Sequence, residues 1–456
     1  HGAQMSSTVE MPVWALVLLV AFAAVTFASH FLFPSVRWFF RRRMERLVAQ
    51  LNKRLTRPIE PSKLARRYDM IQRLIYDPEI STAIAAHAAA RGVPENVAFE
   101  TARRYAREIV PSFSAWTYFR FATRAARLLS QAVYHVRAVH HEGDALEGVD
   151  PEATVVFVMN HRSNMDYVLV TYLSAGRGAL SYAVGEWAHI WPLSALVRSM
   201  GAYFIRRRDG NGLYRVILAK YVRLATQGGV SQAVFPEGGL SLTGRMAEPR
   251  LGILKYIVEA HDPAGRDVVF VPVALNYDRV LEDRILVRAD AGGTRRFKAS
   301  VRSALWFGVK TLWSRVTGRY VAFGYAGVSF GAPLSLSGFE GGVEALAQDL
   351  MGRIAKEVPV LPVPLVATAL LQGEGPVDRV ALEMRVKALL AQLAGASVYV
   401  PRENRGYAVE VGLRTLQARK LVVETDGQVQ IVEAERPLLT FYAASIAHLL
   451  PNGSGA

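Results

Sequence analysis

The chain of 456 residues contains no cysteine. Without thiols it can form no disulfide, no thiolate metal site and no cysteine acyl-enzyme. Acidic side chains are also scarce, because 39 Asp and Glu residues stand against 54 Lys and Arg residues and leave a formal charge of +15. This excess predicts an anionic partner, which a phosphate substrate, an acidic lipid or a nucleic acid would each satisfy.

Charged side chains of either sign are missing between Glu10 and Arg37, where Met11 to Phe33 is almost wholly apolar. A membrane span needs about 20 apolar residues, whereas a signal-peptide core needs about 7 to 15 after a basic start. No Lys or Arg precedes this segment. We therefore predict an N-terminal transmembrane helix, with a buried core helix as the alternative. Basic residues are concentrated from Arg37 to Arg67, so the positive-inside rule places the rest of the chain in the cytoplasm.

Composition divides the chain into four regions. We expect residues 1–36 to hold the terminal tail and the transmembrane helix, residues 37–136 a basic helical region, residues 137–360 an α/β domain, and residues 361–456 a mainly helical domain with a small hairpin. A proline-rich stretch at Pro359–Pro364 marks the last boundary. Short β-rich runs alternate with helical runs in the third region, which predicts a mostly parallel sheet flanked by helices.

The α/β domain is expected to contain six strands. They are Thr154–Met159, Leu180–Val184, Ala202–Ile205, Gln232–Phe235, Val268–Leu275 and Tyr320–Phe330, with helices at Tyr167–Ala175, Leu213–Thr226 and Ile253–Ala260. In the last region we expect a helix at Ala408–Lys420 and a hairpin at Leu421–Ile431 that turns at Asp426 and Gly427.

The most informative motif follows the first of these strands, where His161 and Asp166 stand five positions apart. His161 lies at the carboxyl end of a predicted parallel strand, where such sheets place their sites. A strand-to-helix turn can bring Asp166 onto one imidazole nitrogen, which fixes the tautomer and stabilises the imidazolium. The other nitrogen can then accept the proton of an alcohol. The alternative is a solvated His161 with Asp166 favoured by a helix dipole.

Two further polar clusters follow predicted strands. Arg206–Arg208 can bind a phosphate in bidentate fashion, although a solvated basic turn is the alternative. Glu237 is followed by Gly238 and Gly239, which let backbone amides approach a ligand closely, while Glu237 can orient a hydroxyl or an arginine. Because these clusters and His161 all follow strands, we expect them at one edge of the sheet and in one site.

Four blocks of sequence occur in order along the chain. They are Asn160–Asp166, Gly201–Arg207, a third block that starts with Phe235–Gly239, and the proline-containing Val271–Tyr277. Together they resemble the blocks of glycerol-phosphate acyltransferases within the wider lysophospholipid acyltransferase group, the first block having a His and an Asp separated by four residues. The segment Phe441–Leu450 is similar to the closing segment of bacterial glycerol-3-phosphate acyltransferases. The resemblance runs from about residue 137 to the terminus.

The resemblance implies an O-acyltransferase in which His161 is the general base and Asp166 orients it. The acceptor oxygen would attack the thioester of acyl-CoA or acyl carrier protein directly, with no acyl-enzyme, no metal ion and no tightly held cofactor. The substrate-binding residues implied are Arg206 and Arg207 for the acceptor phosphate and Glu237, Gly238 and Gly239 around the acceptor.

The third block departs from the family pattern, because Leu240 and Leu242 stand where many members carry arginines. Arg245, Arg250 or Lys255 would then supply the missing charge. The C-terminal region and the second block favour acylation of the sn-1 hydroxyl of glycerol 3-phosphate to lysophosphatidic acid, the first step of phospholipid synthesis. The apolar leucines favour the alternative, in which lysophosphatidic acid is the acceptor and phosphatidic acid the product.

A membrane-tethered nucleic-acid-binding protein is the alternative from another class, because a helix followed by a hairpin also occurs in winged-helix DNA-binding proteins. That helix carries only Arg414, Arg419 and Lys420, opposed by Glu410, so we expect it to pack rather than to bind nucleic acid. The expected partners are glycerol 3-phosphate, acyl-CoA or acyl carrier protein, and anionic membrane lipid. The expected location is the inner membrane, with the catalytic domain on its cytoplasmic face.

Overall fold

The computed structural model describes eight stretches of the chain. They are residues 67–111, 123–140, 148–174, 181–184, 202–204, 212–292, 323–399 and 405–451. The predicted transmembrane helix within residues 1–36 lies outside the described residues, as do Arg206 and Arg207. None of the described helices combines the length and the apolar character needed to cross a bilayer.

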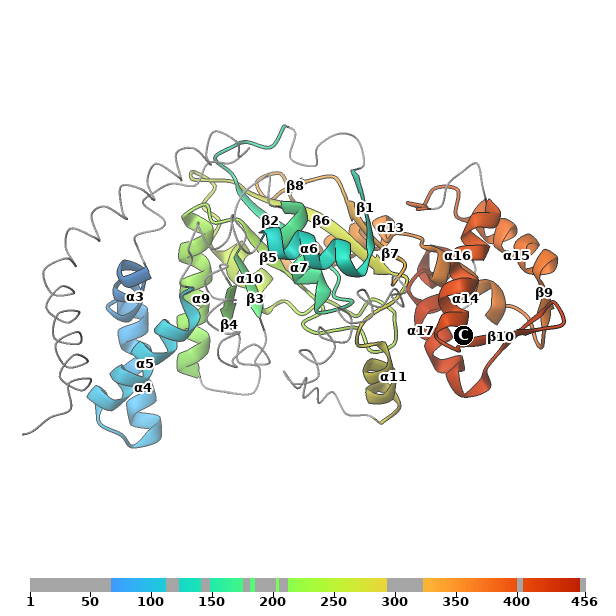
Figure 1. Cartoon of the computed structure of the whole chain (residues 1–456). Coiled ribbons are helices and arrows are strands. Elements are labelled where there is room, and N and C mark those ends of the chain that lie inside the picture. The colour runs from blue at the N-terminus through green and yellow to red at the C-terminus, as the bar shows by residue number, and fades with distance from the viewer. Residues whose placement is uncertain are drawn as a thin grey trace, which may run out of the picture. The chain divides into compact units, whose positions relative to one another are not determined.

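A mixed sheet lies at the centre of the described α/β part (Figure 1). In spatial order it consists of β1 (His135–His140), β7 (Tyr325–Phe330), β6 (Val268–Tyr277), β2 (Thr154–Met159), β5 (Gln232–Val234), β3 (Ser181–Val184) and β4 (Ala202–Phe204), with β8 (Leu334–Ser335) also paired to β6. Strands β6, β2, β5, β3 and β4 run parallel, whereas β7 and β8 run antiparallel to β6. The prediction of an α/β fold with a mostly parallel sheet is therefore confirmed.

The central strands read as continuous apolar runs because both of their faces are covered. In β2, Val155, Phe157 and Met159 belong to the core on one face, whereas Val156 and Val158 belong to the core on the other. This alternation is the two-residue period of a strand. Predicted strands coincide with β2 and lie within a few residues of the others. The edge strand β1 escaped prediction because it carries exposed polar side chains such as Arg137.

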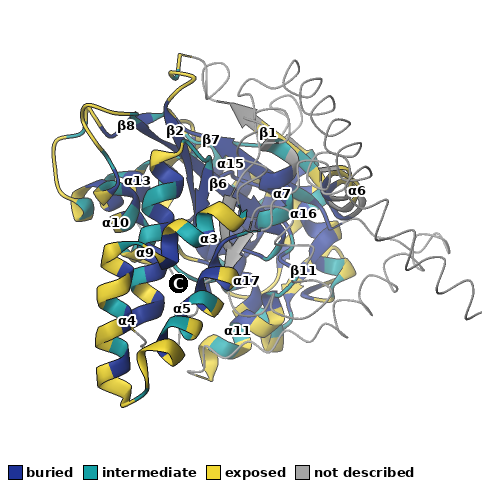
Figure 2. Ribbon diagram, turned by 90° about the vertical axis from the view of Figure 1, so that its left-hand side faces the viewer, coloured by how far each residue is buried: buried dark blue, intermediate teal, exposed yellow. Residues whose placement is uncertain are grey.

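Helices form the two layers that bury the sheet. One face is covered by α3 (Arg67–Ile75), α4 (Pro78–Arg91), α5 (Glu95–Ile109), α9 (Gly212–Gln227), α10 (Gly252–Glu259) and α13 (Val343–Glu357). The other face packs against α6 (Thr123–Val133), α7 (Met165–Ser174), α11 (Asp283–Ala291) and the C-terminal helices. Figure 2 shows the buried strands between these layers and the exposed outer side of α4. The three predicted helices correspond to α7, α9 and α10.

The C-terminal region is mainly helical, as predicted. It consists of α14 (Pro362–Leu371), β9 (Val377–Asp378), α15 (Arg379–Gln392), α16 (Arg405–Ala418), β10 (Val422–Thr425), β11 (Gln428–Ile431), η3 (Glu433–Glu435), α17 (Arg436–Ala444) and η4 (Ala447–Leu449). The predicted hairpin is β10 and β11, and it turns at Asp426 and Gly427 with positive φ at both residues. Strand β9 adds a third member to this small antiparallel sheet.

One face of helix α16 is buried, which argues against the nucleic-acid-binding alternative. A side chain at Gly412 would place its Cβ 2.6 Å from Val366 of α14, so the two helices approach closely. The exposed Arg414 pairs with Glu410 one turn earlier. The side chain of Arg419 is 9% exposed and pairs with Asp283. These cations therefore do not form the basic surface that binding to a phosphate backbone requires.

Candidate active site

The turn after β2 carries the candidate site, and a side chain fixes where that turn begins. Asn160 donates to the carbonyl of Leu275 at 2.9 Å and accepts from the amide of Leu275 at 2.8 Å. The Asn160 side chain thus pairs with β6 one residue beyond the end of β2. His161 is thereby placed at the carboxyl edge of the sheet, beside the ends of β5 and β6, as predicted.

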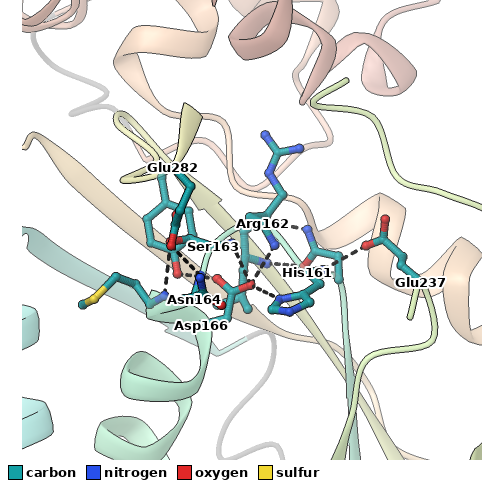
Figure 3. Close-up of polar contacts among 11 residues, drawn as sticks. His161, Arg162, Ser163, Asn164, Asp166, Glu237 and Glu282 are labelled. Atoms are coloured by element: carbon teal, nitrogen blue, oxygen red, sulfur yellow. Dashed lines mark hydrogen bonds and ion pairs between the residues drawn. The ribbon is translucent and has the colours of Figure 1, made fainter. Parts of the chain in front are cut away.

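His161 and Asp166 meet as the sequence predicted. The imidazole Nδ1 lies 2.9 Å from Asp166 Oδ2, and both side chains are buried (Figure 3). Because the Asp166 carboxylate also accepts from backbone amides on that oxygen, Nδ1 must carry a proton and Nε2 presents its lone pair. Among the described residues, Nε2 has no hydrogen-bond partner. This tautomer is the one that can accept a proton from a hydroxyl group.

Three aromatic or phenolic side chains hold the pair in place. The imidazole lies 4.3 Å from the ring of Phe235 and 5.4 Å from the ring of Tyr167, measured between centroids. The hydroxyl of Tyr277 donates to Asp166 Oδ1 at 2.5 Å. Burial raises the pKa of Tyr277, and the negative Asp166 beside it acts in the same direction, so the phenol stays a donor.

Every backbone amide from His161 to Asp166 is engaged, mostly by carboxylates. The donors and acceptors are His161 to Glu237 at 2.9 Å, Arg162 and Ser163 to Asp166 at 2.7 and 3.0 Å, Asn164 to Glu282 at 3.2 Å, Met165 to Ser163 Oγ at 3.1 Å, and Asp166 to the Ser163 carbonyl at 3.0 Å. We call residues 161–166 the catalytic turn. Its conformation is therefore set by side chains from three separate parts of the chain.

Glu237 holds the backbone of the catalytic turn rather than projecting freely. Its second oxygen accepts from the amide of Ala247 at 2.7 Å. Burial raises the pKa of Glu237, while these amides and the nearby Arg162 oppose the rise. The predicted position of a carboxylate beside His161 is correct. In the structure both oxygens of Glu237 accept from the protein backbone. Its role in substrate binding stays a prediction.

Arg162 is the buried cation of the catalytic turn. Its guanidinium donates to the carbonyl of Gly244 and to Asn276 Oδ1, the latter at 3.3 Å, and lies 5.6 Å from the ring centre of Phe441 on α17. Burial lowers the pKa of Arg162, and the negative charges of Glu237 and Asp166 oppose this effect. The catalytic turn is therefore in contact with the closing segment of the chain.

Two glycines in the loop after β5 are required by close contacts. Gly238 has a φ of +69°, and a Cβ there would lie 2.7 Å from Cδ of Arg250. Gly244 has a φ of +84°, and a Cβ there would overlap the carbonyl of Phe441. The close neighbour of Gly238 is thus a protein side chain, and the predicted approach of its backbone to a ligand stays a prediction. Nothing in the described contacts constrains Gly239 in this way.

The three cations proposed for the acceptor phosphate lie in different surroundings. Arg245 lines a cavity of about 550 Å³ between the third-block loop, α11 and α17, together with Leu242 and Phe441. The side chain of Arg250 packs against Gly238, next to the catalytic turn. Lys255 lies on the exposed side of α10, 3.8 Å from Glu259. The described part of the chain contains no cluster of three His, Cys, Asp or Glu side chains that could hold a metal ion.

Tyr277, Glu282, Asn160 and Arg162 belong to the site but were not assigned roles from the sequence. The first three act on the catalytic turn through contacts across more than 100 positions of sequence. Asn160, Arg162 and Tyr277 stand inside the quoted blocks, so block membership was the signal available for them. Glu282 lies outside all four blocks, and its sequence position gave no such signal.

Comparisons with known proteins give two family-model matches. The acyltransferase family model matches residues 139–276, and the model of the glycerol-3-phosphate acyltransferase C-terminal region matches residues 315–454. The chain is 29% identical over 436 residues to the glycerol-3-phosphate acyltransferase of Shewanella amazonensis, covering 87% of this chain and 51% of that protein. It is 27% identical over 421 residues to that of Pseudomonas putida, covering 85% and 49%. The chain thus spans about half the length of the curated relatives it matches.

A solved structure also matches part of the chain. It is the 1-acyl-sn-glycerophosphate acyltransferase of Thermotoga maritima, with 16% sequence identity and a TM-score of 0.33. The match covers 56% of this chain and 79% of that one.

Proposed function

We propose, since the chain belongs to the glycerol-3-phosphate acyltransferase family, that it transfers a fatty acyl group to the sn-1 hydroxyl of glycerol 3-phosphate. The donor would be the thioester of acyl-CoA or of acyl carrier protein, and the product lysophosphatidic acid. One observation carries the proposal most directly. The buried His161 donates from Nδ1 to Asp166 and keeps Nε2 available at the carboxyl edge of the sheet.

The geometry supports direct transfer with His161 as general base. Nε2 takes the proton of the acceptor hydroxyl as its oxygen bonds to the thioester carbonyl carbon. Asp166 stabilises the imidazolium that forms. When the tetrahedral intermediate collapses, the carbon–sulfur bond breaks and the imidazolium returns its proton to the thiolate. The enzyme is then regenerated without a covalent acyl group on any side chain.

The direct test is acyl transfer by the purified chain in detergent, with glycerol 3-phosphate and lysophosphatidic acid compared side by side and each donor supplied in turn. We expect lysophosphatidic acid to form from glycerol 3-phosphate. Phosphatidic acid formation alone would assign the chain to the second acylation, which the apolar Leu242 in the cavity wall favours. Absence of transfer to either acceptor would contradict the proposed function.

Arg245 and Arg250 are proposed to supply positive charge for the acceptor phosphate, in addition to Arg206 and Arg207. We expect Arg245→Ala and Arg250→Ala each to raise the KM for glycerol 3-phosphate about tenfold or more, because a hydrogen bond to a charged group is worth about 1.5–3 kcal/mol. Lys255→Ala tests the third predicted cation in the same way, and Arg353→Ala is the matched control, since Arg353 pairs with Asp349 on α13. An unchanged KM in the Arg245 and Arg250 variants would exclude them as phosphate ligands.

Membrane attachment is proposed from the apolar segment at residues 11–33 and the basic stretch that follows it. The catalytic domain would then lie on the cytoplasmic face of the inner membrane, near the anionic lipids that attract its basic residues. Deleting residues 1–36 should move the protein from the membrane fraction to the supernatant. If the shortened protein still sedimented with membranes after a high-salt wash, this segment would not be the anchor.

A further inference from the structure

Glu282 stands where a helix-capping residue is expected, yet its side chain caps no amide of its own helix. It is the residue before α11, and no hydrogen bond joins its carboxylate to the first turn of that helix. Instead, Oε2 accepts from the hydroxyl of Ser163 at 2.8 Å and Oε1 from the amide of Asn164 at 3.2 Å (Figure 3). The Glu282 carboxylate thus binds the catalytic turn and not its own helix.

These two contacts lead directly to the His161–Asp166 pair. The Ser163 hydroxyl that donates to Glu282 also accepts from the amide of Met165, the first residue of α7. Asp166 follows in that helical turn and accepts from the amide of Ser163. Fixing Ser163 therefore fixes the start of α7 and with it the Asp166 carboxylate. Glu237 holds the other end of the turn at the His161 amide.

The neighbour of Glu282 is anchored in the C-terminal region. Asp283 lies 2.6 Å from a guanidinium nitrogen of Arg419 and accepts from the hydroxyl of Tyr442 on α17. Arg419 also donates to the Tyr442 hydroxyl at 3.0 Å, and this hydroxyl accepts from the amide of Val280 at 3.0 Å. All three side chains are buried or nearly so, with Arg419 and Asp283 9% and 4% exposed. The loop that presents Glu282 is thereby tied to the turn that follows α16 and to α17.

Burying the Glu282 carboxylate costs free energy, and a side chain that only filled space would avoid this cost. Burial raises the pKa of Glu282, and the negative charge of Asp166 acts in the same direction. The two hydrogen bonds from the turn offset part of this cost. Only a side chain that accepts two bonds at once can hold both Ser163 and Asn164, and a carboxylate does so without a donor of its own.

We propose that Glu282 is a positioning residue that holds the catalytic turn in its reactive conformation and makes that conformation depend on the C-terminal region. The proposal rests on the proposed acyl transfer, in which His161 must meet the acceptor hydroxyl in a narrow range of geometry. A misplacement of about 1 Å can lower a rate by about 100-fold. Binding of glycerol 3-phosphate and donor uses other residues, so their KM values should be insensitive to Glu282.

The test compares Glu282→Ala with Glu282→Gln in the full chain. We expect kcat to fall about 30-fold in the alanine variant, with less loss in the glutamine variant because its amide oxygen still accepts one bond. KM for both substrates should stay within about twofold. Arg284→Gln is the matched control, because Arg284 joins α11 to Glu435 through an exposed pair and does not contact the turn. This control should leave kcat unchanged.

A double-substitution cycle separates positioning from general damage to the fold. If Glu282 acts through Ser163, combining Glu282→Ala with Ser163→Ala should cost clearly less in kcat than the product of the two single losses. Hydrogen exchange gives a readout independent of turnover, and the amides of residues 163–166 should exchange faster in Glu282→Ala. Unchanged kcat, a KM effect as large as the kcat effect, multiplicative losses or unchanged exchange would each overturn the proposal. A wild-type chain without transfer activity but with the expected exchange would instead count against the proposed function alone.

Discussion

His161→Ala is expected to lower kcat/KM for glycerol 3-phosphate by about 1,000-fold, in line with the about 10²–10⁴-fold that a general base contributes. The substitution removes the nitrogen that would accept the hydroxyl proton. It leaves the backbone amide of residue 161 able to donate to Glu237. The turn should therefore persist, and the loss should appear in the chemical step. Initial rates in detergent with saturating donor provide the measurement.

His87→Ala is the control for this experiment, because His87 lies on α4 in the helical layer packed on α9. It should retain wild-type rates. The alanine at position 161 also leaves a space beside the rings of Phe235 and Tyr167, so the thermal midpoint of both variants must be compared. Near-normal turnover of a folded His161→Ala protein would contradict the general-base mechanism.

The His161–Asp166 pair could be predicted because its geometry is local. A buried apolar strand, a short polar turn and a helix leave few ways to place two side chains five positions apart, and the sheet edge fixes where they point. The same reasoning placed Glu237 beside them, since β2 and β5 are parallel neighbours. Burial at every position of β2 and β6 gives continuous apolar runs, which made those strands the easiest to predict.

The residues that hold the His161–Asp166 pair in place could not be predicted in the same way. Tyr277 and Glu282 reach Asp166 and Ser163 across 111 and 119 positions of sequence. A polar residue after a strand signals a site, but it does not reveal which of its neighbours it will bind. Glu282 illustrates the difficulty, because its place before α11 indicates a helix cap while its side chain turns to another segment.

The contact between the third block and α17 also depends on tertiary packing. Gly244 reads from the sequence as a flexible loop glycine, whereas in the structure its missing side chain makes room for the backbone of Phe441. Arg162 then lies between the carbonyl of Gly244 and the ring of Phe441. From the sequence, the closing segment could be identified only by its resemblance to the family. Its packing against the catalytic turn gives that resemblance a physical reason.

Asp166→Asn is expected to separate the charge of this residue from its role in orientation. Asp166 Oδ2 accepts from His161 Nδ1 and from the amides of Arg162 and Ser163, all of which are donors. An asparagine must therefore place its oxygen there, because its amino group would face three donors. Its nitrogen then points to Tyr277, whose hydroxyl can rotate to accept. The tautomer of His161 is retained while the negative charge is lost.

Because orientation survives, we expect kcat/KM to fall by about 100-fold, near the lower end of general-base contributions. The imidazolium loses its stabilising anion, so the loss should appear in the chemical step and not in the KM for glycerol 3-phosphate. Asp166→Ala should cost more activity and also stability, since it leaves two buried amides without acceptors at about 1–3 kcal/mol each. Asp262→Asn is the matched control, as Asp262 accepts from a backbone amide in an exposed turn. If Asp166→Asn kept near-wild-type kcat/KM while Asp166→Ala lost activity, Asp166 would act through orientation and not through its charge.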